Sequence, residues 1–348
     1  MRQMLFRLLA LILFAFAALP AKAADMLALA GWPDAVDPAV LDSFTRETGT
    51  VVSFDAVVDA DAFDRKLTTG KSDYDLVFLN SASLDQLGKA GALKPLDAAK
   101  LPNAAGVVPL LRQGAAQFDP GNRFAVPYMW GGVAFGVDEA KVRDRLGVNA
   151  PRSWDLLLKP ELSSKLRDCG ISVVDVPDAV LPGVMRALGS LPASQQPADL
   201  IRAADALLRV RGNIRRFHAP AEVNSLAGGE VCLMVGRSRD LAIALQRARA
   251  AGSAAALAIW APREGAPIWF DSLAIPKDAP NAEKALALMN FLLHPEIAAR
   301  NAAYLRQSNS ATAYPDQATS GAMFVVPVRN VQQQVAIDRV WARVKASR

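Results

Sequence analysis

Short apolar segments alternate with amphipathic segments along most of this chain, and this alternation restricts the fold more than any other feature of the sequence. The apolar run Met26–Ala30 precedes a helix pattern with Asp37 as N-cap, Pro38 as first helical residue and Gly49 as the stop. The segment Tyr74–Leu79 is nearly all apolar, which is typical of a strand covered on both faces of a parallel sheet. The repeated strand–helix order predicts an α/β fold.

The same alternation continues to the end of the chain. We predict further strands at residues 51–57, 128–137, 171–174, 231–235 and 268–275, and further helices at residues 60–69, 83–90, 197–210, 240–251, 282–293 and 331–345. The 348 residues are too many for one compact domain and enough for two. Because no flexible linker separates two halves of the sequence, we expect two lobes joined by strands that cross between them.

The N-terminal segment Met1–Ala23 has the organisation of a secretory signal peptide. Arg2 and Arg7 precede the apolar run Leu8–Leu19, and a small-x-small cleavage site ends at Ala23. The run is shorter than the roughly 20 residues that span a bilayer, and no cysteine lies near the site to carry a lipid anchor. We expect cleavage after Ala23 and export to the periplasm, with an uncleaved membrane anchor as the alternative.

The charge balance of the exported part argues against a nucleic-acid partner. The whole chain has a formal net charge of +5, from 39 basic and 34 acidic residues. Three of the basic residues and none of the acidic ones lie in the signal segment, so cleavage leaves a net charge of +2. A surface this balanced lacks the bulk positive charge on which phosphate binding depends.

The sequence offers little for an enzyme, a metal or a cofactor. Its two histidines, His218 and His294, share no ligand spacing with each other or with acids, and His294 is expected to end the helix at 282–293. Phosphate-loop, dinucleotide-binding and nucleophile-elbow motifs are absent from the sequence. We therefore expect no catalysis, no metal and no cofactor; a secreted hydrolase is the alternative that a turnover screen would expose.

The two cysteines, Cys169 and Cys232, are candidates for a disulfide in an oxidising compartment. Closing a loop of that length is worth about 3–4 kcal/mol on the chain-entropy model. Sequence alone does not bring their Cα atoms within bonding reach, so two buried free thiols remain the alternative.

Aromatic residues next to acids mark the candidate binding site. Trp32 and Asp34 follow the first strand, Trp269 and Asp271 lie on a later strand, and Asp240 follows the strand that ends near Gly236; Trp130 precedes a Gly-Gly pair. Ligands of open α/β sheets bind at the carboxyl ends of strands, and carboxylates beside aromatic faces suit an ammonium group. The alternative, that the tryptophans belong to the core and the acids cap helices, is equally open from composition.

In these residues the chain resembles the bacterial periplasmic solute-binding proteins for polyamines, especially the putrescine-binding type. The likeness is carried by short motifs in a specific order: Gly31-Trp32-Pro33-Asp34, Phe44-Thr45-Arg46-Glu47-Thr48-Gly49, Tyr74-Asp75-Leu76-Val77, Lys94-Pro95-Leu96-Asp97, Ala125-Val126-Pro127-Tyr128-Met129-Trp130, Ser153-Trp154-Asp155, Leu158-Lys159-Pro160, Asn213-Ile214-Arg215, Trp269-Phe270-Asp271 and Ile337-Asp338-Arg339-Val340. The family also has a disulfide where Cys169 and Cys232 fall.

The resemblance implies a type II periplasmic-binding-protein fold, in which two lobes, each a sheet flanked by helices, close on a ligand in the cleft between them. Crossings are implied near Trp130, Trp269 and Ser308. The first lobe then comprises residues 24–131 and 269–308, and the second comprises residues 132–268 and 309–348.

The resemblance also implies a set of ligand-binding positions, which in this sequence carry Trp32, Asp34, Asn80, Asp178, Arg237, Asp240, Trp269, Asp271 and Arg306. Two of them depart from the family pattern, because Arg237 stands at an aromatic position and Arg306 falls at or beside a tyrosine position. A family glutamate falls on Ala179, although a shift of one residue would place Asp178 there. If Arg237 faces the ligand it disfavours a dication; pairing with Asp240 or pointing into solvent would leave diamine binding intact.

The function implied is that of a periplasmic substrate-binding protein of an ABC importer, a monomer working with permease and ATPase subunits. Its expected ligand is putrescine, another polyamine or a related small aminated solute. One alternative is an ω-amino acid, a zwitterion that would satisfy both the acids and the arginines. Another is a ligand-sensing protein that signals to a membrane receptor.

Overall fold

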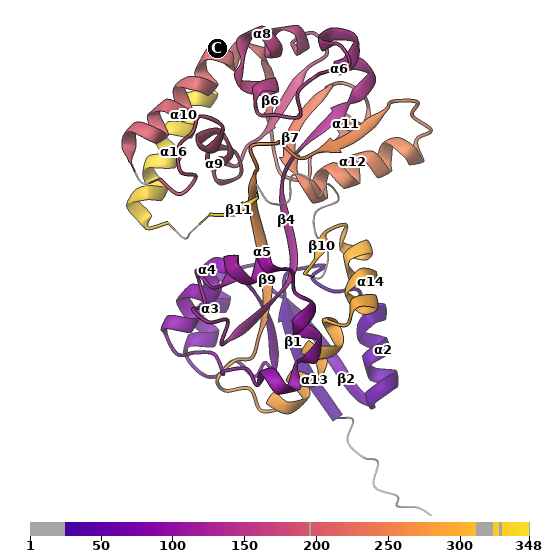
Figure 1. The fold of residues 1–348 in the computed structure, drawn as a ribbon. Helices are drawn as coiled ribbons and strands as arrows, with labels where there is room; N and C mark the ends of the chain where they lie inside the picture. Colours follow the sequence, from indigo (N-terminus) through magenta and orange to yellow (C-terminus); the bar gives the residue numbers. More distant parts are fainter. Residues whose placement is uncertain (1–24, 195, 311–322, 327–328, 348) are drawn as a thin grey trace, which may run out of the picture.

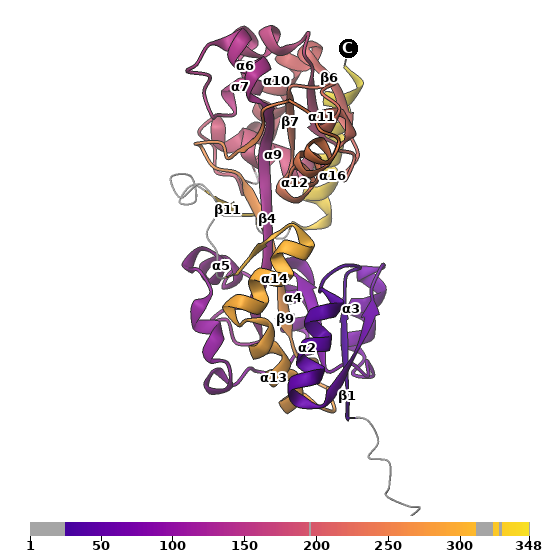
Figure 2. The same cartoon turned by 90° about the vertical axis from the view of Figure 1, so that its right-hand side faces the viewer.

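The computed structural model describes residues 25–194, 196–310, 323–326 and 329–347 as two α/β lobes stacked end to end (Figures 1 and 2). The expected signal segment and its cleavage site lie outside the described residues. The strands follow the order β2-β1-β3-β9-β4-β7-β5-β6, so one path of hydrogen-bonded strands runs through both lobes. Within the described ranges, no helix combines the length and the apolar character that a membrane crossing requires.

The first lobe is built on a mostly parallel sheet. Its strands are β1 (Asp25–Gly31), β2 (Thr50–Ala56) and β3 (Leu76–Asn80), with β9 (Pro267–Ala274) antiparallel to β3. The helices around them are α2 (Pro38–Thr48), α3 (Ala60–Thr68), α4 (Ser81–Lys89), α5 (Pro109–Ala115), α13 (Ala282–Leu292) and α14 (Pro295–Leu305). The strand–helix order expected from the sequence is therefore present.

Local signals set the ends of α2 as the sequence predicts. Asp37 has extended backbone angles, and its side chain accepts a hydrogen bond from the backbone N–H of Ala39. Gly49 ends the helix at φ 75°, a left-handed conformation that only glycine adopts without strain. The apolar face, with Val40 and Phe44, is buried against the sheet.

The second lobe contains β5 (Ile171–Val174), β6 (Ile214–His218), β7 (Leu233–Arg237) and β8 (Leu257–Trp260). Its helices are α6 (Glu139–Leu146), α7 (Asp155–Leu158), α8 (Pro160–Ser163), α9 (Pro177–Ala187), α10 (Pro197–Val210), α11 (Asn224–Ala227), α12 (Ser238–Ala250) and α16 (Val331–Ala346). A disulfide joins Cys169 to Cys232 with their Cα atoms 5.5 Å apart, which confirms the expected pairing.

Two long strands, β4 and β9, connect the lobes and pair with each other. β4 (Ala125–Asp138) is buried along all of its 14 residues and pairs first with β9 and then, from Val133 onward, with β7. The short strand β10 (Ser308–Asn309) pairs with β4, and β11 (Phe324–Val325) pairs with β9. Trp130 lies opposite Ser308, and its neighbour Gly131 lies opposite Trp269, so the three expected crossings meet at one place.

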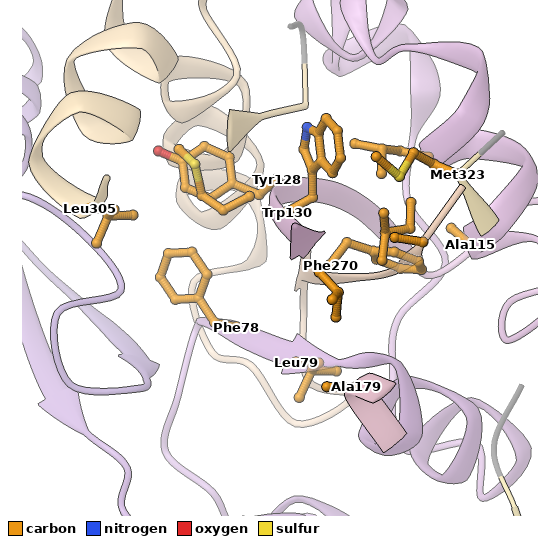
Figure 3. Packing of buried hydrophobic residues seen from close by; sticks show 14 of the residues in the cluster. Phe78, Leu79, Ala115, Tyr128, Trp130, Ala179, Phe270, Leu305 and Met323 are labelled. Carbon is orange, nitrogen blue, oxygen red and sulfur yellow. The ribbon is translucent and has the colours of Figure 1, made fainter. Parts of the chain in front are cut away.

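The core continues through this junction. Figure 3 shows Tyr128 and Trp130 of β4 among the side chains of Phe78 and Phe270, which come from β3 and β9. The rings of Phe78 and Tyr128 are 5.7 Å apart, and the Trp130 indole N–H donates to the backbone carbonyl of Asn309 at 2.9 Å. Trp130 is therefore a core residue.

The expectation for His294 was wrong. It does not end a helix but forms the N-cap of α14, with extended backbone angles (φ −60°, ψ 132°). The cause is Pro295, because a residue that precedes proline is pushed out of the helical region.

Candidate functional site

A cavity of about 730 Å³, here called the central cavity, lies beside β9 where the chain passes between the lobes. The first lobe contributes Asn80 and the first residues of α4. The second lobe contributes Asp178 at the start of α9 and Arg237 at the end of β7. Residues 267–271 of β9 line it between them. The cavity therefore has walls from both lobes, as a clamp around a small molecule requires.

Trp269 and Asp271 are the aromatic and the acidic residue that β9 contributes to the lining of the central cavity. They are two residues apart on β9, so their side chains leave the strand on the same side. The indole of Trp269 lies against the backbone of Gly131, where an added Cβ would come within 2.9 Å of ring atom Cζ2. Glycine at position 131 thus leaves the space that the ring occupies.

Asp271 is a partly buried acid with one side-chain partner. The indole N–H of Trp32 donates to its Oδ1 at 3.3 Å, and Asn80 lies opposite it on β3. Burial raises the pKa of Asp271 to about 6, and the hydrogen bond from Trp32 offsets only part of this shift. Bringing a cation to Asp271 would favour its ionised form and relieve the cost of burying the charge.

A smaller space, here called the lateral cavity, also has Asp271 in its lining. It has a volume of about 50 Å³, and its lining includes Trp32, Asp34 and Arg239. Asp34 is exposed, has a left-handed backbone (φ 63°) and lies 3.9 Å from the Arg239 guanidinium across the two lobes. Asp271 therefore lines both cavities, whereas Trp32, which donates to it, lines the lateral cavity alone.

Arg237 faces the central cavity. Its guanidinium carbon lies 5.8 Å from the centre of the Trp269 ring, at the outer limit of a cation–π contact. No ion pair joins it to Asp240 or to any other described acid. Asp178, on the same wall, forms an ion pair with Arg329, whose side chain is mostly buried.

Two expected site residues, Asp240 and Arg306, line neither the central nor the lateral cavity. Asp240 is buried in the first turn of α12 and accepts a hydrogen bond from the backbone N–H of Ala221 at 3.3 Å. Arg306, the left-handed C-cap of α14, donates from Nε to Gln246 Oε1 at 2.6 Å, which links α14 of the first lobe to α12 of the second. In this arrangement both residues hold structure around the cleft rather than line it.

Sequence reasoning missed Arg329 and Arg239, which line the two cavities. Arg329 stands before α16, next to Asn330, whose side chain caps that helix. The cap is visible in the sequence, but it predicts only where a helix begins. Neither arginine belongs to a motif, so no local signal identifies them.

The described residues contain no group of three or more His, Cys, Asp or Glu side chains that would hold a metal ion. His218 is buried, its Nδ1 lies 2.8 Å from the Ser172 hydroxyl, and its backbone carbonyl accepts from Asp175. Burial and the nearby Arg216 lower the pKa of His218 to about 4, so it stays neutral at pH 7. This histidine fits a structural role in the second lobe.

Comparisons with known proteins agree with this architecture. A model of the bacterial extracellular solute-binding protein family matches residues 39–322. The putrescine-binding periplasmic protein SpuD of Pseudomonas aeruginosa is 36% identical to this chain, and the match covers 98% of each protein. The putrescine-binding periplasmic protein PotF of Escherichia coli is 34% identical, and the match covers 91% of this chain and 90% of PotF. The crystal structure of the spermidine/putrescine ABC transporter substrate-binding protein PotD from Streptococcus pneumoniae superposes with a TM-score of 0.79 at 26% identity, covering 92% of this chain and 98% of that one.

Proposed function

This chain belongs to the bacterial extracellular solute-binding protein family, and from that premise we propose that it is the periplasmic substrate-binding component of an ABC importer. It captures a small aminated solute between its lobes and delivers it to permease and ATPase subunits in the cytoplasmic membrane. The names of its relatives, which bind putrescine or spermidine, support an amine as the recognised group.

The observation that carries this proposal is the central cavity, which places an acid and an aromatic ring on a strand shared by both lobes. Asp271 accepts charge-assisted hydrogen bonds from the ligand ammonium, and the Trp269 ring packs against the methylene groups that follow. Because Asn80 and Arg237 reach the cavity from opposite lobes, a ligand that contacts both lowers the free energy of the closed form. Closure is then the signal that the transporter reads.

Transport rather than catalysis fits the chemistry of the cleft. Its polar side chains are two carboxylates, two guanidinium groups, two amides and the hydroxyl of Ser81, and the residues that line it include no histidine or lysine to serve as a base for that hydroxyl. Export with cleavage after Ala23 and action as a monomer complete the proposal.

The test is binding to the mature chain, residues 24–348, after bound solute has been removed. A thermal-unfolding screen covers diamines, ω-amino acids and α-amino acids. A true ligand at about 100 times its Kd stabilises the fold by about 2.7 kcal/mol. Absence of stabilisation by every aminated compound would refute the proposal.

Variants locate the site. We expect Asp271→Asn to weaken binding by about 1.5–3 kcal/mol, the usual worth of a hydrogen bond to a charged group. Trp269→Ala removes the ring beneath the ligand and also weakens binding. Asp42→Asn, which changes an exposed acid on α2, is the matched control and leaves affinity unchanged. Equal affinity of all four proteins, wild type included, would place the binding site elsewhere.

A further inference from the structure

The charged side chains around the central cavity comprise one ion pair and two separate charges. Asp178 is engaged with Arg329, so this pair is already neutral. Asp271 has only the Trp32 indole as a side-chain partner, and Arg237 has only the Trp269 ring, among the residues that the structure describes. One negative and one positive charge thus remain for a ligand.

These two charges stand at either end of an apolar platform. Arg237 pairs with Val133 of β4, beyond the pairs Gly131–Trp269 and Gly132–Ile268, so its guanidinium, 5.8 Å from the Trp269 ring, comes from the end of β9 away from Asp271. Asp271 follows Trp269 on the same side of β9, about 7 Å further along, because two strand residues advance by about 3.3 Å each. The wall therefore presents, in order, a cation, an aromatic ring and an anion.

We propose that the preferred solute is an ω-amino acid, with its ammonium group at Asp271, its short methylene chain along Trp269 and its carboxylate at Arg237. This inference rests on the proposed function, since it assigns a ligand class to the same binding site. A carboxylate matches the guanidinium of Arg237 because the two form parallel, charge-assisted hydrogen bonds.

A diamine of the same length matches this wall poorly. Its second ammonium group would lie beside a guanidinium instead of an acid. At a separation of about 6 Å and an effective dielectric near 20, this repulsion weakens binding by about a hundredfold. Arg237 would also remain without an acceptor as the lobes close and exclude water, which adds to the penalty.

Ligand pairs test the inference on the unaltered protein. Isothermal titration calorimetry on the solute-free mature chain compares 4-aminobutanoate with 1,4-diaminobutane, which differ only in the charged group at one end. A third compound, 4-aminobutanamide, keeps the shape of the amino acid and removes its negative charge. We expect the amino acid to bind at least tenfold more tightly than either of the other two.

Protein variants identify the residue responsible. Arg237→Gln is expected to weaken binding of 4-aminobutanoate about thirtyfold and to strengthen binding of 1,4-diaminobutane at least tenfold. Arg247→Gln makes the same change on the exposed face of α12, where Arg247 bonds to Asn224, and leaves both affinities unchanged. Thermal unfolding of each variant verifies that it is folded.

The outcomes separate this inference from the proposed function. If 1,4-diaminobutane binds more tightly than 4-aminobutanoate and loses affinity in Asp271→Asn, the inference is overturned and the proposed function stands. If Arg237→Gln changes both affinities in the same direction, Arg237 does not contact the carboxylate and the inference is again overturned. If no aminated compound binds, both fall.

Discussion

Replacing Asp271 by Asn is expected to stabilise the ligand-free protein while it impairs binding. Burial raises the pKa of Asp271 to about 6 from an ordinary value of 3.8. Because the pKa is higher in the folded state, ionisation of Asp271 costs stability as the pH rises from about 4 to about 6, and the full cost persists above that range. A shift of about two pK units corresponds to about 3 kcal/mol, and we expect about 1–2 kcal/mol, since the side chain retains some contact with water. Asparagine has no charge to bury and still accepts the Trp32 N–H.

The assay is equilibrium unfolding of ligand-free wild type and Asp271→Asn in urea, at several pH values between about 4 and 8. Near pH 4 the aspartate is protonated, so the two proteins should differ little. Near pH 7.5 the variant should be more stable by the amount given above. Adding the ligand well above the Kd of both proteins should reverse the order, because the wild type gains about 1.5–3 kcal/mol more stability from binding than the variant.

Two results would refute this reasoning. A variant less stable than wild type by the same amount at every pH would mean that Asp271 stabilises the fold through neutral contacts. An unchanged pH profile, with no difference at either extreme, would mean that the carboxylate is well solvated in the free protein. Asp42→Asn is the control, because that acid is exposed and its replacement should leave the profile unaltered.

Other measurements follow from the same structure. Ligand affinity should fall about tenfold between pH 7 and pH 5, because an Asp271 with a pKa near 6 must first lose its proton; calorimetry showing constant affinity over that range would exclude Asp271 as the anionic partner. Cys169 and Cys232 should resist alkylation in exported protein until a reductant is added, which mass spectrometry would show. Reduction should cost a few kcal/mol of stability without changing which solute binds. Gly131→Ala should displace the Trp269 ring and weaken binding at least tenfold. The melting temperature should fall little, because the added methyl group meets a side chain that lines the cavity. Unchanged affinity would show that the ring does not contact the solute.

The helices and strands were largely predictable because their signals are local. Asp37, Pro38 and Gly49 define α2 through contacts within a few residues, and the structure places them as expected. The meeting of the crossings at Trp130, Trp269 and Ser308 required the family resemblance, because no local pattern indicates which strands from distant parts of the chain pair.

The candidate site was less predictable, as two tryptophans illustrate. Trp130 and Trp269 both stand on crossing strands near glycine or an acid, yet Trp130 is buried in the core and Trp269 lines the cavity. β4 is buried on both faces, so its sequence lacks the alternation that distinguishes the sides of a strand. The positions of Asp240 and Arg306 depend on partners contributed by distant segments, Ala221 and Gln246, which the sequence does not identify.

The order of strands in the first lobe determines when that lobe is able to fold. β9 lies between β3 and β4 in the sheet, yet it follows β3 by nearly 190 residues, between Asn80 and Pro267. An early fragment ending before Pro267 has no strand to fill this gap, and its β3 edge stays open. β9 follows most of the second lobe in the chain, so the first lobe completes its sheet only after most of the second lobe has been synthesised. Loop closure over such a distance is also slow. A chain built this way stays incompletely folded until late in synthesis, which would suit the export proposed above if the polypeptide crosses the membrane unfolded.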